Sequence, residues 1–217
     1  MPENDPRIQP LCVSELTADL LKIVLPLIQV NAAVGARDQE SLTDLMIEQS
    51  TDESSATVLS RLETLPEIVR TMLRHPDLFA RQTDIGLQLL SRGALPGRDR
   101  ELAILRVGWL CQAPYEWGEH VIIAKSLGIS SEEVERITQG SSAPGWTEHE
   151  RAILRATEEL RENAMISDST WAVLARTYNE QQLIELPIVI GQYQTVAYYQ
   201  NSLRLRLHAG NDGLKSR

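Results

Sequence analysis

The chain has 217 residues, of which 42% are hydrophobic, and this is enough to build an ordinary buried core. Its 30 acidic and 21 basic residues give a formal net charge of -9, which argues against nucleic acid and anionic membrane surfaces as partners. The two cysteines, Cys12 and Cys111, lie far apart and form no CxxC pair, so we expect neither a disulfide framework nor a cysteine metal site.

The N-terminal region contains an apolar run at residues 20–34, LLKIVLPLIQVNAAV. This run is shorter than a membrane span and includes Lys22 and Pro26, so it predicts a kinked helix over residues 16–30 that is buried or lies at an interface. A polar stretch over residues 39–56 follows and is expected to be a mobile loop or a weak helix. The polar first ten residues do not resemble a secretory signal, and we expect a reduced, cytoplasmic protein.

Strand signals are scarce beyond this region, because no stretch alternates apolar and polar residues for long. Helical signals recur instead, including capping boxes formed by Ser130 with Glu133 and by Thr147 with Glu150. The predicted helices cover residues 58–75, 77–92, 100–110, 115–127, 130–137, 147–163, 168–178 and 181–205, the last with a bend at Pro187. The sequence therefore predicts an all-α protein.

We expect one domain over residues 1–217. Its parts are an N-terminal extension at residues 1–57, a helical core at residues 58–208 and a frayed tail at residues 209–217. Within the core, two consecutive helices are joined by a tight turn at Pro114, so they are expected to be antiparallel neighbours.

These two helices place acid and base groups in an apolar setting. Glu101 lies on the first helix, and Glu116 and His120 lie one turn apart on the second. Side chains four residues apart share a helix face, so Glu116 is predicted to hydrogen-bond His120 and fix its tautomer. An imidazole with a carboxylate partner is suited to general acid–base catalysis, with Glu101 as a second proton carrier.

The residues predicted to contact a substrate are Tyr115, Trp117, Trp109 and Cys111. Three alternatives stay open. The acidic and histidine side chains could form a solvated ion pair, with the tryptophans in the core. Cys111 could be a reactive thiol or a small buried hydrophobe. The same acid and base groups could hold a metal ion, although the spacing lacks the paired histidines of HExxH.

The segment RDRELAILRVGWLCQAPYEWGEHVIIAKSLGIS resembles the carboxymuconolactone decarboxylase family of the alkylhydroperoxidase D-like superfamily. PRIQPL near the start and SDSTWAVLARTYNEQQLIELPIVIGQYQTVAYYQNSL near the end add to this resemblance, which extends from about Leu62 onward. It implies an alkylhydroperoxidase D-like helical bundle with an expanded N-terminal helical region. It also implies a homo-oligomer, either a trimer, a hexamer or a dimer, with sites near subunit contacts.

The superfamily contains two chemistries. Peroxidase members use a CxxC pair, a following histidine and a glutamate on the preceding helix. Glu101 and His120 match the last two, but Ala113 and Glu116 occupy the cysteine places, so a thiol cycle is disfavoured. Decarboxylase members lack CxxC and keep a glutamate four residues before the histidine, as Glu116 and His120 do. Glu101 departs from this branch, in which a small polar residue is usual.

The resemblance thus implies a cofactor-independent lyase or isomerase of the decarboxylase type. Its substrate would be a small unsaturated compound that carries a carboxyl group or a lactone, and no cofactor or metal is expected. One alternative is a thiol-dependent peroxidase that uses Cys111. Another is a non-catalytic protein that binds a small molecule or acts as a scaffold.

Overall fold

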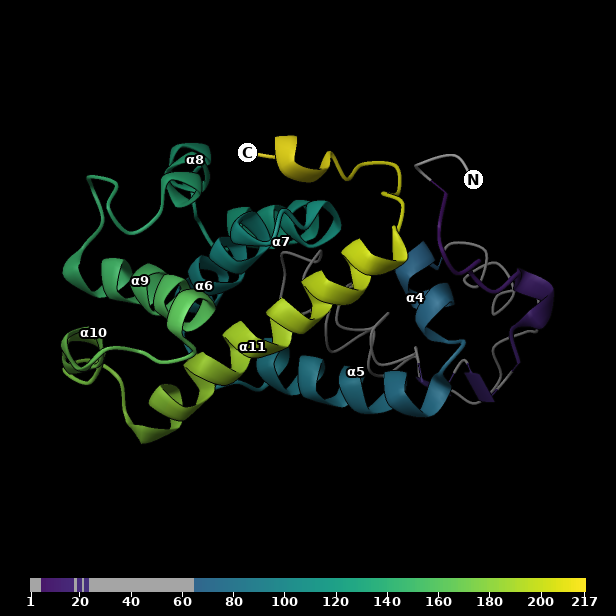
Figure 1. The fold of residues 1–217 in the computed structure, drawn as a ribbon, viewed down its shortest axis with the longest axis horizontal. Coiled ribbons are helices and arrows are strands. Elements are labelled where there is room, and N and C mark those ends of the chain that lie inside the picture. The colour runs from purple at the N-terminus through teal and green to yellow at the C-terminus, as the bar shows by residue number, and fades with distance from the viewer. Residues whose placement is uncertain (1–4, 18, 21, 24–64) are drawn as a thin grey trace, which may run out of the picture. The chain divides into compact units, whose positions relative to one another are not determined.

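The computed structural model describes residues 5–17, 19–20, 22–23 and 65–217. All regular elements in these ranges are helical, which confirms the predicted all-α class (Figure 1). The mobile loop predicted at residues 39–56 lies outside the described residues, as does most of the helix predicted at residues 16–30.

The chain divides into two compact units, residues 6–91 and residues 92–217 together with residues 1–5. This division falls between Ser91 and Arg92. The predicted N-terminal extension at residues 1–57 and core at residues 58–208 stay predictions. The single domain over the whole chain stays a prediction.

The described residues of the smaller unit include the 3-10 turn η1 (Val13–Glu15) and the helices α4 (Glu67–Met72) and α5 (Pro76–Ser91). Its core is built from Leu11, Leu65, Leu73 and Phe79. The backbone N–H of Leu11 donates to the carbonyl of Arg70 at 3.1 Å, and the Arg70 guanidinium donates back to the Leu11 carbonyl at 3.1 Å. This reciprocal pair fixes the N-terminal segment against α4.

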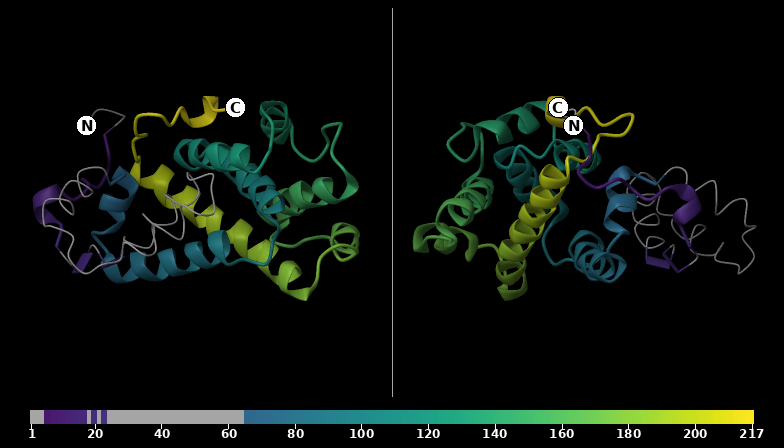
Figure 2. Two further views of the ribbon diagram at one scale, coloured as in Figure 1. Left: turned by 180° about the vertical axis from the view of Figure 1, so that it is seen from behind. Right: turned by 45° about the vertical axis from the view of Figure 1, so that its right-hand side comes forward.

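The larger unit contains six helices and a final 3-10 turn: α6 (Gly97–Leu110), α7 (Pro114–Ser126), α8 (Ser131–Gln139), α9 (Glu148–Asn163), α10 (Asp168–Leu174), α11 (Glu180–Leu203) and η2 (Gly213–Lys215). Helix α6 is the central element, because it packs against α7, α8, α9 and α11 (Figures 1 and 2). This explains why α6 is apolar on almost every side, with Leu102, Ile104 and Leu105 fully buried.

Side-chain caps set several helix starts in this unit. Both predicted capping boxes are present, Ser130 with Glu133 and Thr147 with Glu150. A third box, Asn179 with Gln182, starts α11 and was missed in the sequence. The N-cap of α10 is Ser167, and this helix ends at Leu174 instead of continuing to residue 178 as predicted.

The C-terminal tail packs against α7, so the predicted fraying of residues 209–217 is wrong. Asn211 is buried, and its side-chain amide donates to the backbone carbonyl of Tyr115 at 3.0 Å. The indole N–H of Trp117 donates to the carbonyl of Ser216 at 3.0 Å. No short-range pattern could predict these contacts, because the partners lie more than ninety residues apart.

Gly118 allows the close approach of the tail to α7, since an added Cβ would overlap the Asn211 side chain. We expect Gly118→Ala to lower the free energy of unfolding by about 1–3 kcal/mol. The matched control is Gly191→Ala in α11, where nothing lies within 4 Å of an added Cβ. That change should raise stability by up to about 1 kcal/mol. Urea unfolding measures both, and equal effects would contradict this packing.

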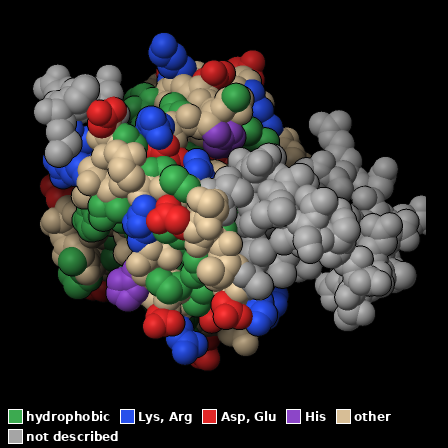
Figure 3. All heavy atoms as spheres, turned by 90° about the vertical axis from the view of Figure 1, so that its right-hand side faces the viewer, with side chains coloured by type: hydrophobic (Ala, Val, Ile, Leu, Met, Phe, Trp, Pro, Cys, Tyr) green, Lys and Arg blue, Asp and Glu red, His purple; other side chains and the backbone are tan. Residues whose placement is uncertain are grey.

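The described surface carries charges of both signs. Figure 3 shows one face, on which Lys and Arg side chains are interspersed with Asp, Glu and hydrophobic side chains. The net charge of -9 is therefore not gathered into one acidic patch on that face. In the part of the chain that the structure describes, no helix has the length and apolar character needed to cross a membrane.

Candidate functional site

A buried contact between α6 and α7 forms the centre of the site. Nδ1 of His120 lies 2.6 Å from Oε2 of Glu101. Glu101 is fully buried, and only 8% of the His120 side chain is exposed. Oε1 of Glu101 accepts a hydrogen bond from Nε of Arg100 at 3.0 Å, so Arg100 holds the carboxylate in place.

This contact fixes the tautomer of His120. A carboxylate accepts at both oxygens, so opposite an ionised Glu101 the Nδ1 of His120 carries the hydrogen of this contact. In the neutral ring, the lone pair is then on Nε2, for which no described residue supplies a hydrogen bond. Nε2 is therefore the ring atom able to accept a proton or, once protonated, to return it.

Glu116 does not orient His120, which corrects the sequence prediction. Its partner is Gln200 of α11: the backbone N–H of Glu116 donates to Oε1 of Gln200 at 3.1 Å. Nε2 of Gln200 donates to Oε2 of Glu116 at 3.4 Å. Helical spacing placed Glu116 and His120 on one face, but it did not fix their rotamers, and Glu101 from the neighbouring helix takes Nδ1 instead.

The carboxyl group of Glu116 is isolated from charge. Burial raises the pKa of Glu116 well above its usual range. Oε1 of Glu116 is buried and has no hydrogen-bond partner among the described residues. It lies beside Gly108 of α6, where an added Cβ would stand 3.3 Å away. These facts favour the neutral carboxylic acid at neutral pH.

The two tryptophans predicted to contact substrate pack together near the C-terminal tail. Their ring centroids lie 5.2 Å apart, and Trp117 is fully buried. The Arg217 guanidinium lies 5.3 Å from the Trp109 ring and 5.6 Å from the Trp117 ring, within range for cation–π contacts. Both rings thus help to hold the tail, and a role for either in substrate binding stays a prediction.

Tyr115 and Cys111 also have partners outside the Glu101 contact. The Tyr115 ring lies edge-on to His208 at 5.9 Å, and burial raises the pKa of the Tyr115 phenol. Sγ of Cys111 accepts a hydrogen bond from Nη1 of Arg161 at 2.9 Å. Burial nevertheless raises the pKa of the Cys111 thiol. Within the described ranges, no three His, Cys, Asp or Glu side chains group in a way that could hold a metal ion.

Two residues of α11 belong to the site and were missed in the sequence, Tyr193 and Gln200. The Tyr193 ring lies edge-on to His120, with centroids 4.7 Å apart and planes at 88°. Burial, and then the nearby Glu101 carboxylate, raise the pKa of the Tyr193 phenol well above its usual range. Their seven-residue separation puts both side chains on one face of the helix, which is the signal that could have revealed them.

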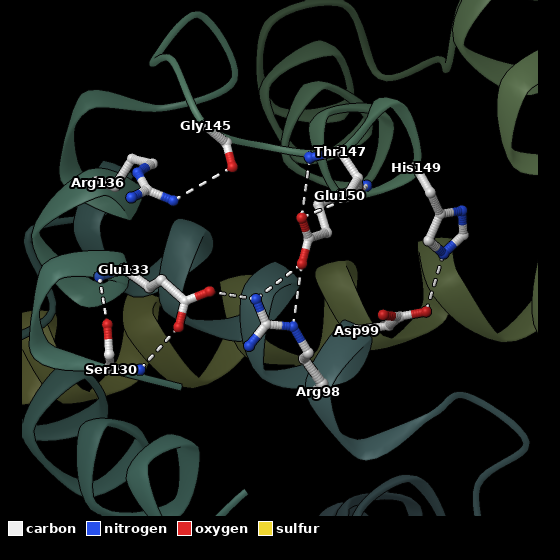
Figure 4. A network of polar contacts seen from close by, with 9 residues as sticks. All are labelled: Arg98, Asp99, Ser130, Glu133, Arg136, Gly145, Thr147, His149 and Glu150. Carbon is white, nitrogen blue, oxygen red and sulfur yellow. Dashed lines mark hydrogen bonds and ion pairs between the residues drawn. The ribbon is translucent and has the colours of Figure 1, made fainter. Parts of the chain in front are cut away.

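A polar network at the start of α6 fixes the helix that carries the buried acid (Figure 4). Arg98 donates to Glu150 of α9 at 2.7 Å and also to Glu133 of α8. Beside it, Oδ2 of Asp99 lies 2.9 Å from Nε2 of His149. The network ties three helix starts together.

The model of the carboxymuconolactone decarboxylase family matches residues 76–159, a segment that contains Glu101, Glu116 and His120. The two site residues of α11 lie beyond it. No curated protein matches the chain.

Solved structures share the fold. An uncharacterised peroxidase-related protein from Ralstonia eutropha, described as an alkylhydroperoxidase AhpD core, matches with a TM-score of 0.60 and 14% identity over 71% of this chain and 83% of that chain. A debrominase in complex with 2,3,4-tribromopyrrole matches with a TM-score of 0.65 and 17% identity over 95% of this chain and 94% of that chain. An uncharacterised peroxidase-related protein from Silicibacter matches with a TM-score of 0.61 and 16% identity over 72% of this chain and 83% of that chain. These likenesses confirm the alkylhydroperoxidase D-like helical fold.

Proposed function

We propose that this protein, with its carboxymuconolactone decarboxylase family segment at residues 76–159, is a cofactor-independent acid–base enzyme. It is a lyase or isomerase of the decarboxylase type and acts on a small unsaturated compound that carries a carboxyl group or a lactone. The observation that carries this proposal is the buried 2.6 Å contact between Glu101 and His120, which leaves Nε2 of the imidazole without a described partner.

His120 is the proton carrier in this proposal. In a decarboxylation, loss of carbon dioxide leaves an electron pair on carbon, and the protonated Nε2 supplies the proton that completes the product. In an isomerisation, neutral Nε2 removes a proton from one carbon and the same atom returns it at another. Glu101 stabilises the imidazolium in both cases, and Arg100 orients Glu101 by donating to its Oε1 at 3.0 Å.

The substrate class has support from a protein of the same fold. The debrominase was solved with 2,3,4-tribromopyrrole, a small unsaturated ring. A compound of similar size that carries a carboxyl group or lactone fits the family to which the matched segment points. The identity between the two chains is 17%, so the likeness suggests a size and type of ligand rather than the same reaction.

Solvent deuterium tests the proposed proton chemistry. In D₂O, turnover of carboxymuconolactone, or of another member of a panel of unsaturated carboxylic acids and lactones, should place deuterium on a product carbon. Mass spectrometry and NMR detect it. His120→Ala should abolish the incorporation, whereas His75→Ala, at an exposed histidine of the smaller unit, should preserve it. Binding of these compounds without any exchange would favour a non-catalytic binding or scaffold protein.

The thiol of Cys111 tests the peroxidase alternative. Because burial raises its pKa, Cys111 should hold less thiolate at neutral pH than a free cysteine and should react more slowly with iodoacetamide. A Cys12→Ser background leaves Cys111 as the sole thiol, and mass spectrometry follows its alkylation. Alkylation faster than that of free cysteine, together with peroxide reduction that Cys111→Ser abolishes, would replace the acid–base proposal with the peroxidase.

We also propose that the protein works in the cytoplasm as a homo-oligomer, a trimer, hexamer or dimer. Helix α11 exposes Ile184, Ile188 and Tyr198, large apolar side chains of the kind that subunit contacts cover. Light scattering coupled to size-exclusion chromatography measures the oligomeric state, and a monomer at micromolar concentration would contradict this part of the proposal.

A further inference from the structure

Helix α7 begins without a cap of its own. Its N-cap residue is Ala113, which offers no side-chain acceptor, and Pro114 occupies the first turn. Backbone N–H groups in the first turn of a helix lack partners within the helix and need an acceptor from elsewhere. Gln200, a buried residue of α11, supplies one by accepting the N–H of Glu116 at 3.1 Å. Gln200 therefore caps α7 from another helix.

This cap fixes the orientation of the Gln200 amide. A backbone N–H only donates, so the amide atom that it meets is the oxygen. The amide nitrogen then faces the Glu116 carboxyl group, 3.4 Å from Oε2. Because an amide N–H also only donates, Oε2 of Glu116 is an acceptor in this contact.

The second oxygen of Glu116 determines the state of the group. Oε1 is buried beside Gly108 and has no described partner. An ionised carboxyl group here would keep a full charge in an apolar site with one described hydrogen bond, at 3.4 Å from Gln200, which is costly. A neutral acid avoids that cost. Its carbonyl oxygen is the better acceptor and corresponds to Oε2, so its hydroxyl corresponds to Oε1.

We infer that Gln200 positions Glu116 as a neutral carboxylic acid whose Oε1 hydroxyl is a spare hydrogen-bond donor for a carbonyl or carboxylate oxygen of the bound compound. Glu116 and His120 lie four residues apart on α7, a helix rise of about 6 Å. The compound would be held by an oxygen at Glu116 while Nε2 of His120 reaches a carbon. This use of the donor rests on the proposed function, whereas the protonation and orientation of Glu116 do not.

Infrared spectroscopy tests the protonation and its cause. The carbonyl stretch of a protonated carboxylic acid is separate from carboxylate bands, and at neutral pH it should disappear in Glu116→Gln. The exposed Glu180→Gln, in the first turn of α11, is the matched control and should leave the band unchanged. In Gln200→Met the band should move to higher frequency, because Oε2 loses its donor.

A double variant separates the two contacts of Gln200. Adding Ala113→Ser to Gln200→Met gives α7 a side-chain cap and should recover the melting temperature lost in the single variant. The band should stay at its shifted position, since the donor to Oε2 is still missing. If Glu116→Gln removes no band, or if Gln200→Met leaves the band in place, the inference is overturned.

Benzoate, a carboxylate on a small unsaturated ring, serves as the probe for the spare donor. Saturating benzoate should shift the Glu116 band to lower frequency in the wild type as Oε1–H gains an acceptor, and Glu116→Leu should weaken benzoate binding at least tenfold by calorimetry. An unmoved band overturns the donor role. The Glu116 band could respond as expected while no compound of the panel incorporates deuterium. That result would contradict the proposed function but not the inferred protonation and orientation of Glu116.

Discussion

Replacing His120 by alanine is expected to lower kcat/KM by about 10²–10⁴-fold on the compound that the enzyme turns over. The physical reason is that Nε2 of this ring is the proposed proton carrier and that Glu101 already holds the other ring nitrogen at 2.6 Å. Steady-state kinetics give the ratio, with circular dichroism to confirm the helical content. His75→Ala, at an exposed position, should leave kcat/KM unchanged.

Glu101→Gln distinguishes a catalytic histidine from a structural one. Glutamine keeps the size of the side chain but loses the charge that stabilises the imidazolium and the second acceptor oxygen. We expect kcat to fall more than KM rises, because the charge matters most when the ring is protonated. Turnover in His120→Ala within about threefold of wild type, less than 1 kcal/mol in the barrier, would remove this pair from the mechanism.

The largest expected effect on stability lies at Arg106. This residue of α6 is 8% exposed. Its guanidinium donates to Glu158 at 2.9 Å and to the backbone carbonyls of Ile137 and Thr138 at 2.9 and 3.0 Å. Arg106→Ala removes the guanidinium donor from both carbonyls and the counter-ion from Glu158, which keeps only its described hydrogen bonds from Ser141. The free energy of unfolding should therefore fall by about 3–5 kcal/mol.

An arginine on α9 provides the comparison for that experiment. Arg155 is paired with Glu159 at 3.8 Å, but its side chain is 61% exposed to water. Arg155→Ala is expected to change stability by about 0.5 kcal/mol or less. Urea unfolding of both variants measures the contrast, and similar losses would show that the buried guanidinium contributes no more than a surface ion pair.

Local signals predicted much of the fold. The two capping boxes and the helix predicted at residues 77–92, observed as Pro76–Ser91, depend on residues close together in the sequence, and the structure confirms them. The apolar setting predicted for Glu101 is confirmed by the burial of α6. The all-helical class follows from the same kind of signal. The division between the smaller and the larger unit, at residues 91 and 92, could not be predicted in this way, because it depends on how helices that are distant in the sequence pack.

The site was predicted in part. The sequence named Glu101, Glu116 and His120, but it paired the wrong carboxylate with the imidazole. Spacing reports which side chains share a helix face, whereas the observed pairs join different helices, over 19 residues for Glu101 and His120 and over 84 residues for Glu116 and Gln200. Side-chain rotamers and the packing of distant helices determine which side chains pair, and neither can be read from a short stretch of sequence.

The missing cap of α7 links two distant positions in the evolution of this fold. Relatives with serine, threonine or aspartate at the place of Ala113 can begin this helix unaided, and position 200 is then free to become apolar. Relatives that keep alanine there need an amide at position 200 to accept the N–H that it accepts in this chain. Positions 113 and 200 should therefore covary.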